Sequence, residues 1–426
     1  MHEKYVQNRK RVNLELFIAR RIAHNGSGNR PGVMVRIAVV AVALSVTVMI
    51  LALAVIMGFK REITDRVTGF SAQVEVADLR SAGSIESVPV LRSEQLERTI
   101  RSAGEVVRLT PYAVKGGVVK MPDAILGVML KGVDGGYEWS FFRDHLLEGE
   151  LPRVGDSIRT KEILISRSVA QEMGLAPGDK VEMLFVESEK SPRRDRFKVS
   201  GIYATGMDEF DRSVAMTDLR NVQRLADWSS DEVSGYEVTL ADFSQAEDFS
   251  RRLNDMLLDS DREAFWDLTA RSAQERFPTV FDWLKTHDVN AAVILVIMVV
   301  VAVFNMATAL LTLVLERTRM IGLLKTMGMN NASLRRIFLY RALMRIVRGA
   351  VWGNAIGLGI CLLQYYFHLI PLDPEGYMLS EVPVAFGVGW WLALNAGVVV
   401  VILTLLMLPA SIISQVEPVE AIRYDS

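Results

Sequence analysis

The sequence predicts a membrane protein with four transmembrane α-helices, one before and three after a large α+β domain of two subdomains. Four stretches without a charged residue each reach the roughly 17 to 25 residues that a membrane-spanning helix needs. A long mixed segment, 60–288, separates the first stretch from the other three. Lysine and arginine gather in two of the flanking segments, as they do on the cytoplasmic side of a membrane. The charge-free stretches are Ile37–Phe59, Val289–Leu315, Gly349–Phe367 and Val382–Val416.

The expected segments follow from these stretches, the last of which is limited to its part between Pro383 and Pro409. They are 1–36 (cytoplasmic, with an interfacial helix), 37–59 (first span), 60–288 (α+β domain, with an inserted subdomain at about 138–230), 289–315 (second span), 316–348 (basic cytoplasmic segment), 349–367 (third span), 368–385 (short external loop), 386–409 (fourth span) and 410–426 (cytoplasmic tail).

The flanking charges predict the orientation. Eight basic residues precede the first span, and segment 316–348 holds eight basic residues against the single acid Glu316. Both segments are therefore expected in the cytoplasm, together with the two termini, and the α+β domain outside it. A signal peptide is the competing interpretation of the first stretch. However, the 36 residues ahead of it are too long for a basic leader, and no small-residue cleavage site follows.

Residues 12–24 place apolar side chains on one side of a helix, which is typical of a helix lying in the membrane interface. A cytosolic helix packed on a partner is the alternative. The glycine-rich segment Asn25–Gly32 is the expected hinge before the first span.

Short strands alternate with short helices in the external segment. Strands are expected at Ala72–Ala77, Val106–Val114, Gly117–Met121, Ala124–Val133, Glu162–Ile165, Lys180–Val186, Phe197–Tyr203, Tyr236–Leu240 and Ala264–Leu268, and helices at Ser93–Ala103, Ser166–Met173 and Phe243–Leu258. The Gly116-Gly117 pair is expected to interrupt the extended structure and so to separate two of these strands.

Motifs for catalysis are absent from the sequence. There is no Gly-Lys dipeptide and hence no phosphate-binding P-loop, and neither H-E-x-x-H nor G-x-S-x-G occurs. Cys361 is the only cysteine and the five histidines are scattered, so no metal site and no catalytic residue are predicted. Asp208, Glu209 and Asp211 resemble paired carboxylates, although a solvated turn is the favoured interpretation. If ATP is used, another chain must bind it.

Small and polar residues inside the spans predict helix contacts. Gly349, Gly353 and Gly357 recur every four residues on one face, a pattern that lets helices approach closely. A flexing point is the alternative interpretation. Asn305 is expected to form an interhelical hydrogen bond, with a substrate contact as the alternative.

Several stretches resemble the FtsX-like superfamily of ABC-transporter permeases and, within it, the lipoprotein-releasing (LolC/LolE-type) permeases. Six such stretches occur in order along nearly the whole chain. They are Gly127–Asp134 (GVMLKGVD), Ile163–Leu184 (ending MGLAPGDKVEML), Val199–Asp211 (VSGIYATGMDEFD), Val303–Asn305 (VFN), Arg319–Met329 and Glu417–Tyr424 (EPVEAIRY). Two positions depart from the family pattern. Met320 stands where the family commonly has an acidic residue, and Arg341 stands where a neutral or acidic residue is expected.

The resemblance implies a multi-pass protein of the bacterial inner membrane with a periplasmic α+β domain. Such a permease forms a homo- or heterodimer with a second permease subunit and binds two copies of a separate ABC ATPase, which holds ATP and Mg²⁺. It transmits ATP-driven motion to the periplasmic domain. It takes an acylated lipoprotein from membrane lipid and passes it to a periplasmic chaperone; no nucleic acid is involved. The efflux type and the cell-division type, which regulates a wall hydrolase, remain alternatives.

The resemblance also implies sites. Segment 316–348 is expected to couple to the ATPase through Arg317, Arg319, Ile321, Leu324, Lys325, Met327 and Gly328, with Ile321, Leu324 and Met327 as apolar anchors. Val55, Phe59, Val293 and Ile297 are the candidates for a substrate cleft, with bilayer-facing positions as the alternative. Residues 187–196 form a predicted charged loop that contacts the chaperone through Pro192, Arg193, Arg194 and Arg196, or is merely solvated.

Overall fold

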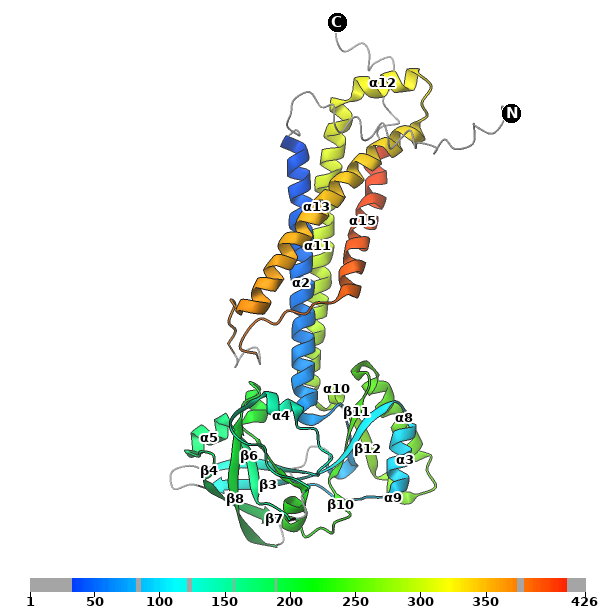
Figure 1. Ribbon diagram of the computed structural model, residues 1–426. Helices are drawn as coiled ribbons and strands as arrows, with labels where there is room; N and C mark the ends of the chain where they lie inside the picture. The colour runs from blue at the N-terminus through cyan, green and yellow to red at the C-terminus, as the bar shows by residue number, and fades with distance from the viewer. Residues whose placement is uncertain are drawn as a thin grey trace, which may run out of the picture. The chain divides into compact units, whose positions relative to one another are not determined.

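A computed structural model describes residues 33–81, 86–120, 125–155, 158–187, 190–373 and 379–411 (Figure 1). The chain divides into two compact units. In its described residues, the membrane unit comprises residues up to Phe59, Lys285–Ile370 and Val382 onward, and the α+β unit comprises Lys60–Leu284 and Pro371–Glu381. The predicted interfacial helix at 12–24 and the tail beyond residue 411 lie outside the described residues.

Four helices are long and apolar enough to cross a membrane in the described part of the chain. They are α2 (Val33–Ser71), α11 (Pro278–Glu316), α13 (Asn331–Phe367) and α15 (Val388–Ala410), and the short α12 (Thr318–Thr326) precedes α13. The first two are longer than the predicted spans. Helix α2 continues from Phe59 to Ser71 and α11 begins at Pro278, so both contribute residues to each unit.

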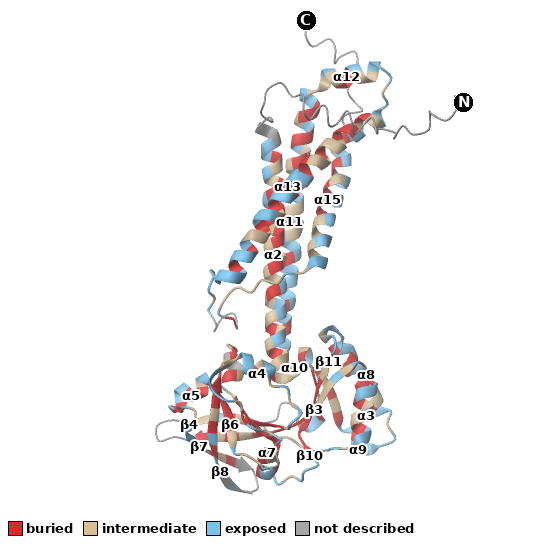
Figure 2. Cartoon of the chain, in the orientation of Figure 1, coloured by how far each residue is buried: buried red, intermediate tan, exposed pale blue. Residues whose placement is uncertain are grey.

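The core of the membrane unit contains side chains from all these helices. Val42, Met49 and Ile50 of α2 belong to the same buried cluster as Met306 of α11 and Ile402 of α15. Along each long helix, buried residues alternate with exposed ones (Figure 2). This is the arrangement of helices that bury one side against their neighbours.

One large sheet forms the framework of the α+β unit. Its strand order is β12-β1-β11-β3-β4-β9-β6-β8-β5, and β7 pairs with both β3 and β8. The strands are β1 (Val74–Asp78), β3 (Val106–Lys120), β4 (Ile125–Val133), β5 (Leu146–Gly149), β6 (Glu162–Ser166), β7 (Lys180–Glu187), β8 (Lys190–Tyr203), β9 (Val214–Asp218), β11 (Gly235–Leu240) and β12 (Leu268–Ser272), with a separate pair β2 (Val90–Leu91) and β10 (Glu232–Val233).

The long strand β3 connects the two halves of this sheet. Its first part pairs with β11 and its second part with β4. Because β7 pairs with β3 at Val118 and Val119, the strands β3-β4-β9-β6-β8-β7 close into a ring. The expected inserted subdomain therefore differs from the observed ring, which includes β3 and β4 from before residue 138.

The Gly116-Gly117 pair does not interrupt the strand as predicted. A Cβ on Gly117 would lie 2.6 Å from the Phe185 ring of β7, so glycine allows the close approach of the two strands. The two predicted strands at Val106–Val114 and Gly117–Met121 are consequently one continuous β3.

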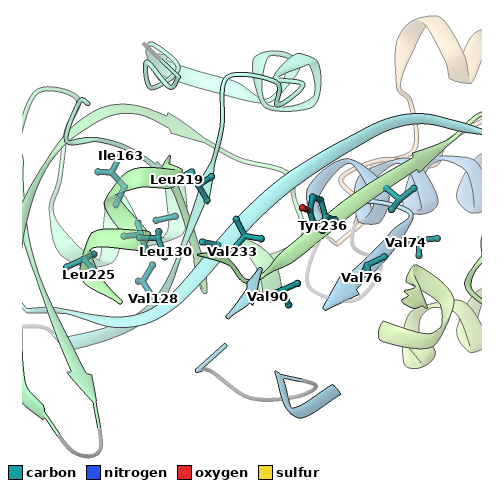
Figure 3. Packing of buried hydrophobic residues seen from close by; sticks show 14 of the residues in the cluster. Val74, Val76, Val90, Val128, Leu130, Ile163, Leu219, Leu225, Val233 and Tyr236 are labelled. Atoms are coloured by element: carbon teal, nitrogen blue, oxygen red, sulfur yellow. The ribbon is translucent and has the colours of Figure 1, made fainter. Parts of the chain in front are cut away.

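Short helices accompany the sheet. They are α3 (Glu94–Ser102), α4 (Ser140–Asp144), α5 (Arg167–Met173), α6 (Asp208–Asp211), α7 (Leu219–Leu225), α8 (Ala246–Leu258), α9 (Glu263–Trp266) and α10 (Ala273–Arg276), with 3-10 turns η1 (Leu79–Ser81) and η2 (Phe243–Gln245). Helices α3, α5, α7, α8 and α9 contribute to one hydrophobic core, part of which Figure 3 shows. Several have serine caps: the Ser93 hydroxyl accepts from the Leu96 backbone N–H, which satisfies an otherwise unpaired donor.

The strand predicted at Ala264–Leu268 is wrong. Residues 263–266 form helix α9, and strand β12 begins at Leu268. Strands β11 and β12 both pair antiparallel with β1, one on each side of it, and are therefore parallel to each other. The connection through α8 thus forms a βαβ unit with β1 between its strands.

Candidate functional site

Helix α12 lies in segment 316–348, for which coupling to the ATPase is predicted (Figure 1). Ile321 is fully buried in the core of the membrane unit, and Leu324 packs against the same core. Leu323 is 50% exposed and Met327 is 82% exposed, and they are one helical turn apart. Ile321 therefore cannot be a docking anchor, because contact with another chain would require it to leave this core. Leu323, which the sequence argument omitted, supplies the exposed apolar side chain beside Met327.

The chain reverses direction between α12 and α13 at Gly328. Its φ of +88° is a conformation that side-chain-bearing residues rarely adopt. Asn330 then caps α13, accepting a hydrogen bond of 2.7 Å from the Ser333 backbone N–H. The predicted Gly328 thus shapes the turn that follows the exposed face of α12. Arg319 is also exposed on α12, whereas Lys325 is half buried.

The three glycines of α13 lie against α2. A Cβ on Gly349 would be 2.7 Å from the Val42 side chain, and one on Gly353 would be 2.6 Å from the Ala43 carbonyl oxygen. At Gly357 the corresponding distance to Ile50 is 3.3 Å. The Thr47 hydroxyl donates a 3.1 Å hydrogen bond to the Gly353 carbonyl. The glycines therefore bring the two backbones close enough for a direct interhelical hydrogen bond.

A polar pair connects α13 with α15. Asn354 Nδ2 donates to Asn395 Oδ1 at 2.6 Å, and Asn395 Nδ2 donates back to Asn354 Oδ1 at 3.1 Å. The Trp391 indole N–H also donates to Asn354 Oδ1. In an apolar environment, amides that satisfy each other specify one alignment of two helices. Sequence reasoning missed this pair, although each asparagine is a polar residue within a charge-free stretch.

Two cations bind the carbonyl end of α2 within the α+β unit. Lys131 Nζ of β4 donates to the Phe70 carbonyl at 3.1 Å and pairs with Glu237 of β11 at 2.5 Å. Arg276 donates from Nη2 to the Ala72 carbonyl at 2.8 Å and also binds the Ser71 carbonyl. Positive charge is stabilising at a helix C-terminus, where carbonyls lack partners within the helix.

Glu75 completes this arrangement, which we call the α2 clamp: Lys131, Glu237, Arg276, Glu75 and Tyr112. Arg276 Nη1 lies 3.5 Å from a Glu75 carboxylate oxygen, and the Tyr112 hydroxyl donates to the same carboxylate. Burial alone would raise the pKa of Glu75, but Arg276 and the Tyr112 hydrogen bond outweigh it and lower that pKa below 4.5. Burial, followed by the charge of Glu75, raises the pKa of Tyr112 well above 10.0.

The clamp was not predicted from the sequence. One signal for it existed, because Lys131 is a charged residue within an apolar strand of the stretch Gly127–Asp134. Helix α11 begins at Pro278, two residues after Arg276. The α2 clamp therefore ties the end of α2 to the residues that lead into α11.

A cavity of about 350 Å³ lies beside the clamp. Glu237 lines it together with Arg108, which pairs with Glu138 at 2.8 Å. Asp65 and Asp144 also contribute carboxylates. The cavity therefore carries more acidic than basic groups and is suited to polar or cationic occupants rather than to acyl chains.

The predicted chaperone loop is largely strand. Strand β7 continues to Glu187 and β8 begins at Lys190, so Pro192, Arg193, Arg194 and Arg196 lie in β8. This end of β8 pairs only with β7 and is therefore an edge, where proline is tolerated.

Partners within the chain already engage these arginines. Arg193 binds the Asp227 carboxylate through both terminal nitrogens, at 2.7 and 2.5 Å. Arg196 lies 3.0 Å and Arg194 3.7 Å from Glu182 carboxylate oxygens on β7. Pro192, Arg194 and Arg196 are exposed, so they are the accessible part of the predicted contact.

The predicted cleft residues differ in exposure. Val55 and Phe59 are half buried on α2, where the Phe59 ring stacks on His287 with centroids 6.4 Å apart. Val293 and Ile297 are exposed on α11. A single chain therefore does not enclose these four side chains.

Asn305 and Asp211, two polar residues that the sequence analysis selected, lie in different surroundings. Asn305 is half buried on α11, and its side chain makes no hydrogen bond to any residue that the structure describes. Asp211 is buried rather than solvated, and it accepts hydrogen bonds from the backbone N–H groups of Thr205 and Gly206. Asp211 therefore shapes a turn.

Two protein-family models match this chain, one over its periplasmic domain and one over its C-terminal membrane helices. The MacB-like periplasmic core domain matches residues 37–256, more than half of the chain, and the FtsX-like permease C-terminal domain matches residues 292–418. The chain belongs to the FtsX-like permeases that carry a MacB-like periplasmic core. It is thus an ABC-transporter permease, and the predicted fold class, with four membrane helices and a periplasmic domain after the first, is confirmed.

Several curated relatives of the permease match most of its length. It is 24% identical over 396 residues to the lipoprotein-releasing system transmembrane protein LolC of Xylella fastidiosa, covering 88% of this chain and 89% of that protein. The corresponding LolE of Haemophilus influenzae is 22% identical over 324 residues, covering 73% of each chain.

Solved structures with related periplasmic regions are more distant. The periplasmic region of MacB from Actinobacillus actinomycetemcomitans matches with a TM-score of 0.34 at 14% identity, covering 50% of this chain and 94% of that one. The extracellular domain of the transporter YknZ from Gram-positive bacteria gives a TM-score of 0.31 at 15% identity, covering 47% and 100%.

Proposed function

We propose that this permease extracts lipoproteins from the outer leaflet of the bacterial inner membrane and passes them to a periplasmic chaperone, driven by a separate ATPase. The observation that carries this proposal is the similarity to LolC across 88% of the chain. The absence of a P-loop from the sequence agrees with ATP binding on a partner.

The energetics favour an ATP-driven mechanism. Removing acyl chains from lipid costs about 0.8 kcal/mol per methylene, so two or three chains cost more than binding to a protein surface supplies. Repeated hydrolysis of Mg²⁺-bound ATP by two copies of the partner ATPase can supply this energy. In this proposal, α12 receives the motion of the ATPase through Leu323 and Met327. The α2 clamp passes motion of α2 on to the periplasmic sheet.

A second permease subunit is part of the proposal. The exposed Val293 and Ile297 on α11 can line a cleft with Val55 and Phe59 only if another subunit closes it. The half-buried amide of Asn305 is suited to a hydrogen bond across the same interface. The positive charge of 316–348 supports a cytoplasmic position for this segment and, with it, for both termini.

Chaperone contact is assigned to the β7–β8 hairpin, through Pro192, Arg194 and Arg196. Exposed positive charge there would speed encounter with an acidic chaperone surface and make it salt-sensitive. An efflux-type permease is the second candidate, because the periplasmic core matches the MacB-like family.

Reconstitution separates the two functions. The permease, its second subunit and the ATPase are placed in proteoliposomes with a triacylated lipoprotein, and transfer to a soluble chaperone is measured with and without ATP. ATP-dependent transfer is the expected result. ATP hydrolysis that is stimulated by small amphiphiles but not by lipoprotein, without transfer, would replace this proposal with efflux.

A further inference from the structure

Three arginines gather where α11 ends and α13 begins its apolar part. Arg317 directly follows α11, and Arg341 and Arg345 are one turn apart on α13. The charges of Arg317 and Arg345 both act on the guanidinium of Arg341. Arg345 is only 6% exposed. Three positive charges are thus held together in a largely dry place.

Each of the three guanidinium groups has a buried nitrogen without a partner. These atoms are Arg317 Nε, Arg341 Nη1 and Arg345 Nη2, and none makes a hydrogen bond in the described part of the chain. Glu316 is the only acid of segment 316–348. It is exposed, and its charge acts on Arg341 and Arg345, but no hydrogen bond or ion pair joins it to the three arginines in the part of the chain that the structure describes. Burying charge without a hydrogen-bonded counterion is strongly unfavourable, and the exposed Glu316 does not provide one, so the buried nitrogens call for a further anion.

We propose that Arg317, Arg341 and Arg345 bind the phosphate group of an anionic phospholipid. A phosphate presents several acceptor oxygens at once, and guanidinium groups match it in geometry as well as charge. One phosphate therefore offers enough acceptor oxygens for the unpaired nitrogens of all three side chains.

The position of the cluster favours a lipid as the source of this phosphate. Arg317 lies two residues beyond the charge-free stretch that ends at Leu315, a depth at which phospholipid head groups lie. Leu315 and Val347 are exposed beside the cluster in sequence and offer apolar surface to acyl chains. The inference does not depend on lipoprotein release, because it concerns a lipid bound by the permease itself.

Lipid retention by the full-length permease tests the proposal. The protein is purified from nanodiscs that contain phosphatidylglycerol in phosphatidylcholine, and retained lipid is counted by native mass spectrometry. Arg341→Gln and Arg345→Gln should each weaken phosphatidylglycerol binding about tenfold, the loss expected for charge-assisted hydrogen bonds. Arg348→Gln, an exposed arginine on the next turn of α13, is the matched control and should retain the lipid. Arg341→Lys keeps the charge and should bind at an intermediate level.

Several outcomes would overturn the proposal. Equal retention by the three glutamine variants would mean that the cluster binds no lipid. Equal binding of phosphatidylcholine and phosphatidylglycerol would exclude recognition of an anionic head group. Inorganic phosphate that protects the permease against heat in an Arg341-dependent way, without retained lipid, would identify a free-anion site. Loss of the ATPase from the variants with unchanged lipid retention would assign the cluster to a protein carboxylate. If Arg345→Gln does not fold, Arg341→Gln, which is less buried, decides.

Discussion

The contact between α2 and α13 predicts that Gly353→Ala destabilises the membrane unit. The added Cβ would lie 2.6 Å from the Ala43 carbonyl oxygen and 2.7 Å from Val46 Cβ, whereas ordinary contacts begin at 3.4 Å. Backbone atoms cannot rotate away as side chains do, so the helices must separate by about 0.8 Å at this point. The Thr47 hydrogen bond to Gly353, now 3.1 Å long, lengthens with them.

The expected magnitude combines three effects. Overpacking costs about 1 to 3 kcal/mol, and weakening an interhelical hydrogen bond costs about 0.6 kcal/mol. Replacing glycine by alanine in a helix returns about 1 kcal/mol. The net effect for Gly353→Ala is a loss of about 0.6 to 2.6 kcal/mol in the free energy of unfolding. Gly359→Ala is the matched control on the same helix, because a Cβ there would have no atom within 4 Å. This variant gains only the higher helix propensity of alanine, so it should be neutral or stabilising.

Titration with SDS in mixed micelles measures this difference. Tryptophan fluorescence follows unfolding, because Trp352 lies on α13 and Trp390 and Trp391 lie on α15. The reasoning is refuted if Gly353→Ala unfolds at the same SDS fraction as Gly359→Ala. Gly357→Ala, with its 3.3 Å contact, should lie between the two.

Three further predictions concern the clamp and the coupling helix. Arg276→Met removes the donors to the end of α2 and one of the two arginines beside Glu75, while Arg271 remains 3.3 Å from that carboxylate; a loss of about 1.5 to 3 kcal/mol is expected by denaturant unfolding, against less than about 1 for the exposed Arg98→Met. Because the pKa of Glu75 is held below 4.5, its contribution to stability is present above pH 4.5 and is lost as the pH falls through the folded-state pKa. Glu75→Gln should therefore have a lower melting temperature at pH 7, and its melting temperature should fall less than that of the original protein as the pH is lowered. Equal falls in melting temperature for the two proteins would contradict this. Leu323→Asp with Met327→Asp should abolish co-purification of the ATPase while the permease still inserts; an intact complex with unchanged ATP hydrolysis would exclude α12 as the docking helix.

The sequence predicted the four spans because apolarity over about 20 residues is a local property. The helix ends were less predictable. Helix α2 continues to Ser71 through Lys60 and Arg61, since charged residues are compatible with a helix once it leaves the bilayer. Strand β3 was divided in two because a glycine pair usually marks a turn. Only the distant Phe185 explains why glycine is required there.

The candidate sites show the same limit. Asn354 and Asn395 are separated by 41 positions, and no spacing rule connects them. Ile321 and Leu323 are equally apolar in sequence, and only the packing of α12 shows which of them is buried. Lone polar residues in apolar stretches, such as Lys131, were visible but could not be paired without coordinates.

Directional contacts, rather than apolar packing, determine where α2 is held. Apolar burial stabilises a helix but permits sliding and rotation, because the hydrophobic effect has no direction. Hydrogen bonds do not permit this: the Thr47 hydroxyl fixes α2 to one carbonyl of α13, and Arg276 and Lys131 fix its last carbonyls to α10 and β4. A force on the helix is therefore resisted at defined atoms, at Thr47 in its first half and at its C-terminal carbonyls. A methionine at position 276 keeps most of the volume while removing the contacts that Arg276 makes at the C-terminal end. If α2 couples the two units in the transport cycle, this substitution should reduce transfer of lipoprotein per ATP hydrolysed more than it reduces hydrolysis itself.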